Sequence, residues 1–136
     1  MSHVRKQIRD AIETALAPLG SVYRSRVYPA DQAELPVFLI YSGDEEDEGN
    51  LSALDRTYSV IVEAVDTGDV LDDVMDGHLA SIEGAINGTL GGTVVSIIPV
   101  GIQVARNASG SRPLGRLRIN YEAHYRTSFT DPQTSI

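Results

Sequence analysis

The sequence contains no cysteine and no tryptophan among its 136 residues, and its only lysine is Lys6. Without cysteine, a disulfide scaffold, an iron–sulfur site and a thiolate zinc site are excluded, and we expect a protein made in a reducing cytosol. No apolar run is long enough to cross a bilayer, and charged residues interrupt any signal-peptide segment within the first twenty positions. The length fits one domain. We expect a single domain over 1–127 and a frayed polar tail over 128–136.

The charges are distributed unevenly along the chain. Residues 1–30 hold five basic and two acidic residues (+3), residues 31–90 one basic and fifteen acidic (−14), and residues 91–136 five basic and two acidic (+3), which gives a net charge of −8. Ten of the eleven basic residues are arginines, whose planar guanidinium suits ordered ion pairs. The negative total disfavours nucleic acid as the main partner, because phosphates repel it. It does not disfavour a second copy of the chain.

Two segments have the periodicity of amphipathic helices. Apolar residues recur every three to four positions over 3–17 and over 70–86, which predicts a helix in each. Ser2 and Asp69 are the expected N-caps.

Residues typical of strands predict five further elements, in which alternation or short apolar runs bounded by turn residues are the signal. The run over 36–42 is nearly all apolar, which suggests a strand covered on both faces. Pro99 and Gly101 imply an edge, a bulge or a bend. We expect loops at 43–53, where adjacent carboxylates repel, and at 107–115. The predicted strands are 22–28, 36–42, 56–65, 94–106 and 117–127.

This order of elements predicts the fold class. The sequence reads helix–strand–strand–strand–helix–strand–strand, with too few helices between strands for a doubly wound parallel sheet. We therefore expect an α+β fold in which a mainly antiparallel sheet carries both helices on one face.

Motifs for catalysis or cofactor binding are missing from the sequence. It has neither a phosphate-binding glycine loop nor a nucleophile-elbow motif. His78 follows Asp76 by two positions on the predicted helix, which directs the two side chains apart, and His124 shares a strand face with Glu122. A cross-strand or interface hydrogen bond is the expected role of His124. We predict no catalytic residue, no metal site and no cofactor.

The charged residues instead form two candidate interface sets. The basic set follows the predicted strands and the 107–115 loop, and the acidic set follows the 43–53 segment and the start of the second helix. Separate positive and negative patches allow head-to-tail association, which closes into a ring or continues as a filament. The candidate interface residues are Arg24, Arg26, Arg112, Arg116, Arg118 and Arg126, and Asp44, Glu45, Glu46, Asp47, Glu48, Asp72, Asp73 and Asp76.

Several segments together resemble the tail terminator (tail completion) proteins of long-tailed bacteriophages, of the lambda minor tail protein U type. They are the opening helix from Val4 to Ile12, the apolar run from Leu35 to Tyr41 with the acidic segment after it, the strand from Arg56 to Ala64, the Asp-rich helix from Asp69, and the strand from Leu117 to Tyr125.

The resemblance implies a non-enzymatic virion protein at the head-proximal end of the tail, present in the host cytoplasm during assembly. It implies a homohexameric ring that caps the tail tube, stops its polymerisation and offers a surface for head or neck joining. The partners would be other copies, the major tail tube protein and a head or neck connector protein, with no membrane; free copies would stay monomeric at low concentration. Another neck or head–tail connector protein, and a small enzyme or ligand-binding domain, remain alternatives.

Overall fold

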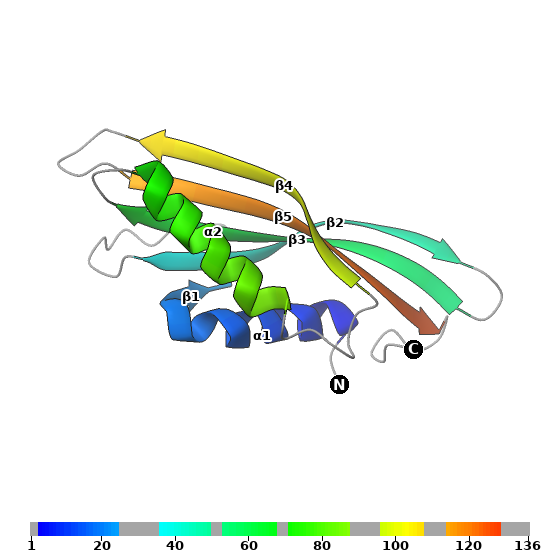
Figure 1. Ribbon diagram of the computed structural model, residues 1–136. Helices are drawn as coiled ribbons and strands as arrows, with labels where there is room; N and C mark the ends of the chain where they lie inside the picture. The colour runs from blue at the N-terminus through cyan, green and yellow to red at the C-terminus, as the bar shows by residue number, and fades with distance from the viewer. Residues whose placement is uncertain are drawn as a thin grey trace.

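The computed structural model describes residues 3–24, 36–49, 53–67, 71–87, 96–107 and 114–128. Two helices, one short 3-10 turn and five strands make up these residues (Figure 1). In chain order they are α1 (Val4–Leu16), η1 (Ala17–Leu19), β1 (Ser21–Tyr23), β2 (Val37–Gly49), β3 (Ala53–Thr67), α2 (Leu71–Asn87), β4 (Ser96–Asn107) and β5 (Leu114–Ser128).

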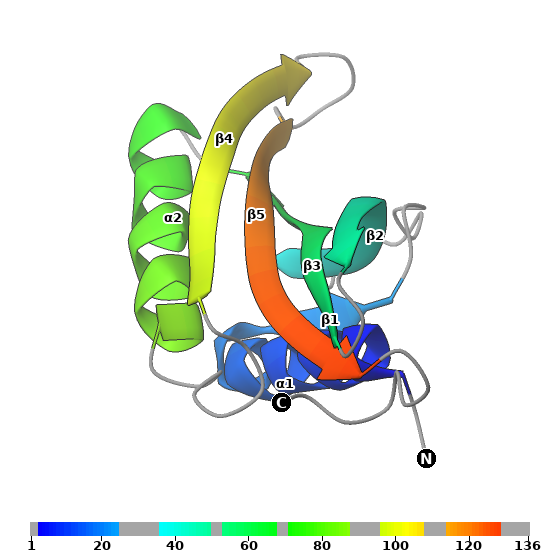
Figure 2. The same cartoon turned by 90° about the vertical axis from the view of Figure 1, so that its right-hand side faces the viewer.

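The strands form one mixed sheet in the order β1-β2-β3-β5-β4. β1 runs parallel to β2, and the other three pairings are antiparallel. α1 and α2 lie on one side of this sheet (Figure 1), and Figure 2 shows how strongly β4 and β5 curve. The predicted α+β class and the order of elements are therefore confirmed.

One hydrophobic core lies between the sheet and the two helices. The periodic residues of α1 are fully buried, and on β5 every second residue from Leu117 to Tyr125 is buried while those between are partly exposed. This confirms the helical stripe and the strand alternation read from the sequence, since each amphipathic element buries its apolar side. The buried cluster comprises Val4, Ile8, Ile12, Leu16, Phe38, Ile40, Tyr58, Val60, Val62, Ala64, Met75, Ile82, Ile86, Leu117, Ile119, Tyr121, Ala123 and Tyr125.

The opposite face of the sheet is also partly buried. Val37 and Leu39 on β2 are fully buried although they alternate with the core residues Phe38 and Ile40. The prediction that this apolar run is covered on both faces is thus confirmed.

The prediction of a loop over 43–53 is wrong for residues 43–49 and for Ala53, and its remaining residues, 50–52, lie outside the described residues. β2 continues to Gly49, β3 begins at Ala53, and the acidic run pairs with β3 from Glu45 opposite Tyr58 to Glu48 opposite Asp55. A strand sends successive side chains to opposite faces, so a run of acidic residues is compatible with a strand whose backbone a neighbour satisfies. β3 supplies those hydrogen bonds after a register shift between Ser42 and Glu45.

Several predicted boundaries also move. The N-cap of α1 is His3, whose Nδ1 accepts a hydrogen bond from the Arg5 backbone N–H at 3.1 Å; Ser2 and Asp69 lie outside the described residues. β1 ends at Tyr23, β4 reaches Asn107, and β5 starts at Leu114, so most of the predicted 107–115 loop lies outside them too. β5 includes Ser128, and the rest of the predicted tail is likewise outside.

Candidate assembly interface

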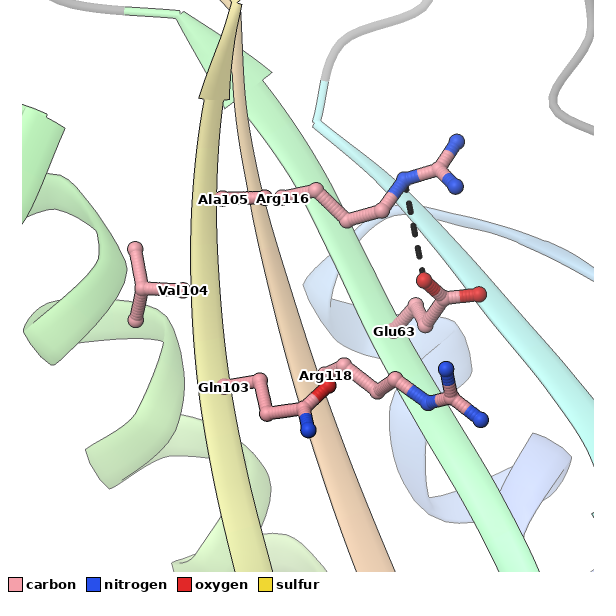
Figure 3. Close-up of a pocket in the computed structure, with 6 residues that line it drawn as sticks. All are labelled: Glu63, Gln103, Val104, Ala105, Arg116 and Arg118. Carbon is pink, nitrogen blue, oxygen red and sulfur yellow. Dashed lines mark ion pairs between the residues drawn. The ribbon is translucent and has the colours of Figure 1, made fainter.

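A hollow on the sheet face away from the helices brings together residues of three strands, with its charged residues on β3 and β5 (Figure 3). On β3, β5 and β4, Glu63 lies opposite Arg118, and Arg118 lies opposite Gln103. One step along, Arg116 lies opposite Ala105. Directly opposed residues project from the same face of a sheet, so the register brings these side chains together. The hollow measures about 390 Å³ and is lined by Glu63, Gln103, Val104, Ala105, Arg116 and Arg118.

The floor of this hollow holds a buried carboxylate. Only 4% of the Glu63 side chain is exposed, and its Oε1 lies 3.6 Å from Nε of Arg116 (Figure 3). A buried charge needs a partner of opposite sign, because a carboxylate that loses its hydration on burial is destabilised unless an ion pair or hydrogen bonds replace that hydration. Arg116 is therefore a structural counter-ion for Glu63 as well as a surface cation, with 42% of its side chain exposed.

Arg118 is the least satisfied group in the hollow. Its Nε atom is buried and has no hydrogen-bond partner, and the same holds for Oδ1 of Asn120, two residues further along β5. Buried polar groups are almost always paired in folded proteins. Arg118 lines an open hollow, where its guanidinium could bind a carboxylate from outside the chain, since Arg–carboxylate pairs are strong and directional.

The other arginines predicted for the interface have different surroundings. Arg24 is held on α1, where its two terminal nitrogens bind Asp10 at 2.9 Å and Glu13 at 2.8 Å. Arg126 pairs across strands with Asp55. That contact lowers the pKa of Asp55 and raises that of Arg126. These ion pairs occupy both arginines within the chain.

Arg26 and Arg112 lie outside the described residues.

The acidic set is divided between α2 and β2. Asp72 and Asp73 occupy the first turn of α2, where the helix dipole favours anions. These two residues and Asp76 are exposed. The acidic run 44–48 lies in the extension of β2, and its side chains are outside what the structure describes. The members of this set whose side chains the structure describes therefore lie on α2, on the face of the sheet opposite to the arginine hollow.

The two histidines considered for chemistry have local partners. Nε2 of His78 lies 2.7 Å from Oδ2 of Asp66, and its ring meets Phe38 edge-on with centroids 5.6 Å apart. His124 contacts the hydroxyl of Thr57 on β3 at 3.3 Å, which confirms the predicted cross-strand role. Among the described residues no group of three potential metal ligands comes together, and no described helix could cross a membrane.

The structure also reveals features that we missed in the sequence. Arg9 on α1 donates to Ser42 Oγ at 3.0 Å and to Tyr58 Oη at 2.9 Å, which ties the helix to the start of the β2 extension. The burial of Glu63 could have been predicted from the sequence, because on its face of the strand it lies between the apolar residues Ile61 and Val65.

Comparison with known proteins places the fold. No protein-family model and no curated protein matches the chain. A solved structure described as the virion of a native gene transfer agent (GTA) particle contains a chain that superposes with a TM-score of 0.51 and 12% sequence identity, over 92% of both chains. At this identity the likeness establishes a shared fold: the chain has the architecture of a protein chain found in a phage-like virion.

Proposed function

We propose that this protein is a structural component of a phage-like virion, and that it acts as a tail terminator. In this role a ring of copies caps the tail tube, stops its growth and presents a surface for head or neck joining. The likeness to a chain of the gene transfer agent virion, over 92% of both chains, carries the proposal. The order of elements and the segregated charges support it.

The charged surfaces suggest how copies recognise one another. The arginine hollow on the open sheet face and the exposed acidic start of α2 lie on opposite faces of the molecule, so one copy can offer each to a different neighbour. A contact between two different surfaces is heterologous, and it closes into a ring when the rotation per copy divides the circle. Complementary charges then select the partner and speed the encounter more than they add affinity.

The virion itself provides the first test. Mass spectrometry of purified particles should detect the protein, and its stoichiometry in isolated tails should match one ring per tail. Host cells lacking it should contain overlong tubes in negative-stain electron microscopy, because nothing stops polymerisation. Tails of normal length that fail to join heads would assign the protein to a connector instead, and its absence from particles would refute a virion role.

A charge exchange tests the contact between copies. Arg118→Asp should abolish ring formation on tail tubes, whereas Lys6→Asp, which removes an exposed cation from α1, should not. Arg118→Asp combined with Asp72→Arg and Asp73→Arg should restore rings, because both surfaces then carry the reversed charge. Urea unfolding of each variant checks that the fold is intact. Rings from Arg118→Asp alone would show that the hollow does not contact a neighbour.

A further inference from the structure

The outer strand of the sheet carries an unusual apolar surface. Ile98, Val100, Ile102 and Val104 on β4 are each 44–51% exposed, and they are the exposed large hydrophobic residues of the described chain. Proteins usually protect such edges with charges, proline, bulges or short strands, because an open edge recruits other strands. Pro99 and the register shift before Gly101 protect the first half of β4.

Between Gly101 and Ala105 the second half of β4 has no proline, no register shift and no charged residue; Arg106 follows near its end. From Gly101 to Asn107 each residue pairs regularly with β5, and β4 is the last strand of the described sheet. Val104 lies on the side that faces α2, and Gln103 lies on the opposite side (Figure 3). An added strand would therefore need apolar residues on the helix side and small or polar residues on the open side.

Within the described chain, only β4 itself meets this requirement. The opposite edge is β1, which has three residues. Beyond β1 the free side of β2 runs into the acidic segment 44–48, and carboxylates brought against apolar side chains would lose hydration without a partner. We infer that β4 pairs with β4 of a second copy, antiparallel and related by a two-fold axis.

The side chains define the register of this pair. With Gln103 opposite Gln103 of the second copy, Ile102 lies opposite Val104 in both directions, and Ala105 lies opposite Gly101. Apolar residues then meet on the helix side, and such cross-strand pairs are what stabilises a sheet. The two copies of β5 would be three strand spacings apart, about 14 Å. That distance exceeds the screening length at physiological salt, so the arginines of the two hollows repel each other little.

The contact is small compared with that of a permanent dimer. Burying the exposed half of an isoleucine or valine side chain removes roughly 50 Å² of apolar surface, so the four side chains at positions 102 and 104 contribute about 200 Å². Stable complexes bury about 1,200–2,000 Å² in total. Backbone pairing and the flanking surfaces add to the contact, and we expect a reversible dimer with a dissociation constant on the order of 100 μM. A two-fold contact closes after two copies, so this dimer is separate from the proposed ring.

Cysteine cross-linking tests the register directly, because the natural chain has no cysteine. Gln103→Cys should form a disulfide dimer under mild oxidation at high protein concentration. Directly opposed strand residues have Cα atoms about 4.5–5.5 Å apart, within the range of about 4.4–6.8 Å that a disulfide requires. Ala105→Cys is the matched control: its copy lies four residues along the strand, about 13 Å away, and should form no disulfide dimer.

Sedimentation velocity tests the association itself without cysteine. The wild-type protein should be monomeric near 1 μM and increasingly dimeric above 100 μM, and Val104→Lys should weaken association at least tenfold. Thr14→Lys, an exposed position on α1, should leave it unchanged. Monomers at every concentration, or equal cross-linking at positions 103 and 105, would overturn the inference. Neither result bears on whether the protein caps tails, since that is measured on particles.

Discussion

Replacement of Tyr121 by phenylalanine should stabilise the protein, and the gain should grow at alkaline pH. Tyr121 is fully buried on β5, and its hydroxyl has no hydrogen-bond partner. Burial, reinforced by the nearby charge of Glu83 on α2, raises the pKa of Tyr121 from 10.0 to about 12. Both observations indicate that the Tyr121 hydroxyl lies in an apolar environment that disfavours a polar or charged oxygen.

Two contributions determine the size of the effect. At neutral pH a buried hydroxyl without a partner costs about 1–3 kcal/mol of desolvation, so Tyr121→Phe should add about 1 kcal/mol to the free energy of unfolding. As the pH rises above 10, the tyrosine ionises in the unfolded chain before it does so in the folded one. The stability linked to the raised pKa of Tyr121 is therefore fully present below pH 10 and is lost as the pH rises towards 12. Linkage makes this loss about 1.4 kcal/mol at pH 11.

Urea unfolding followed by circular dichroism at pH 8, 10 and 11 measures both contributions. All other titrating groups are common to the two chains, so their effects cancel in the difference between variant and wild type. That difference should be about 1 kcal/mol at pH 8 and about 1.4 kcal/mol larger at pH 11. A constant difference would refute the raised pKa, and a variant less stable than the wild type at pH 8 would show that the hydroxyl has a partner.

Three further predictions concern the hollow, the core and the β3–β5 pair. Arg116→Gln should lower the free energy of unfolding in urea by about 1–2 kcal/mol, because it leaves the Glu63 carboxylate without its counter-ion; the loss is smaller than for a fully buried pair because Arg116 is 42% exposed. Adding Glu63→Gln should recover most of that loss. A loss that is not recovered would contradict the pairing. Ile12→Ala should cost about 2–5 kcal/mol in thermal unfolding, since Ile12 is fully buried; a cost below about 1 kcal/mol would exclude this core position. Arg126 lowers the pKa of Asp55 below 3.8, so the stability that this pair contributes is present above pH 3.8 and is lost as the pH falls further. The difference in unfolding free energy between wild type and Asp55→Asn should therefore shrink below pH 4. A difference independent of pH would exclude the ion pair.

Local periodicity accounts for how much of the fold could be predicted. On β5 the alternation from Leu117 to Tyr125 identified the strand and its buried face. Successive side chains of a strand point to opposite faces, so this pattern can be seen in consecutive residues of the sequence. The same is true of α1, whose apolar stripe reappears intact in the core. Pro99 and Gly101 indicated an edge or a bulge on equally local grounds, and β4 has both.

The acidic segment shows where local reasoning failed. Charge repulsion between neighbours favours a loop when the segment is considered alone, yet residues 44–49 belong to β2. β3 lies beside them and is itself held by β5 on its other side. The backbone hydrogen bonds that such a template offers cannot be inferred from the segment's own residues.

The candidate site divides in the same way. From the sequence alone, arginines and acidic residues could be placed in separate parts of the chain, with Arg116 and Arg118 on one strand face. Only the tertiary structure decided that Arg24 and Arg126 are paired within the chain, that Glu63 lies buried beneath Arg116, and that Arg118 has an unpartnered nitrogen. The period of a strand or helix is encoded in consecutive residues, whereas the partner of a charge depends on the register between strands that are distant in the sequence. That register is determined by the packing of the whole sheet.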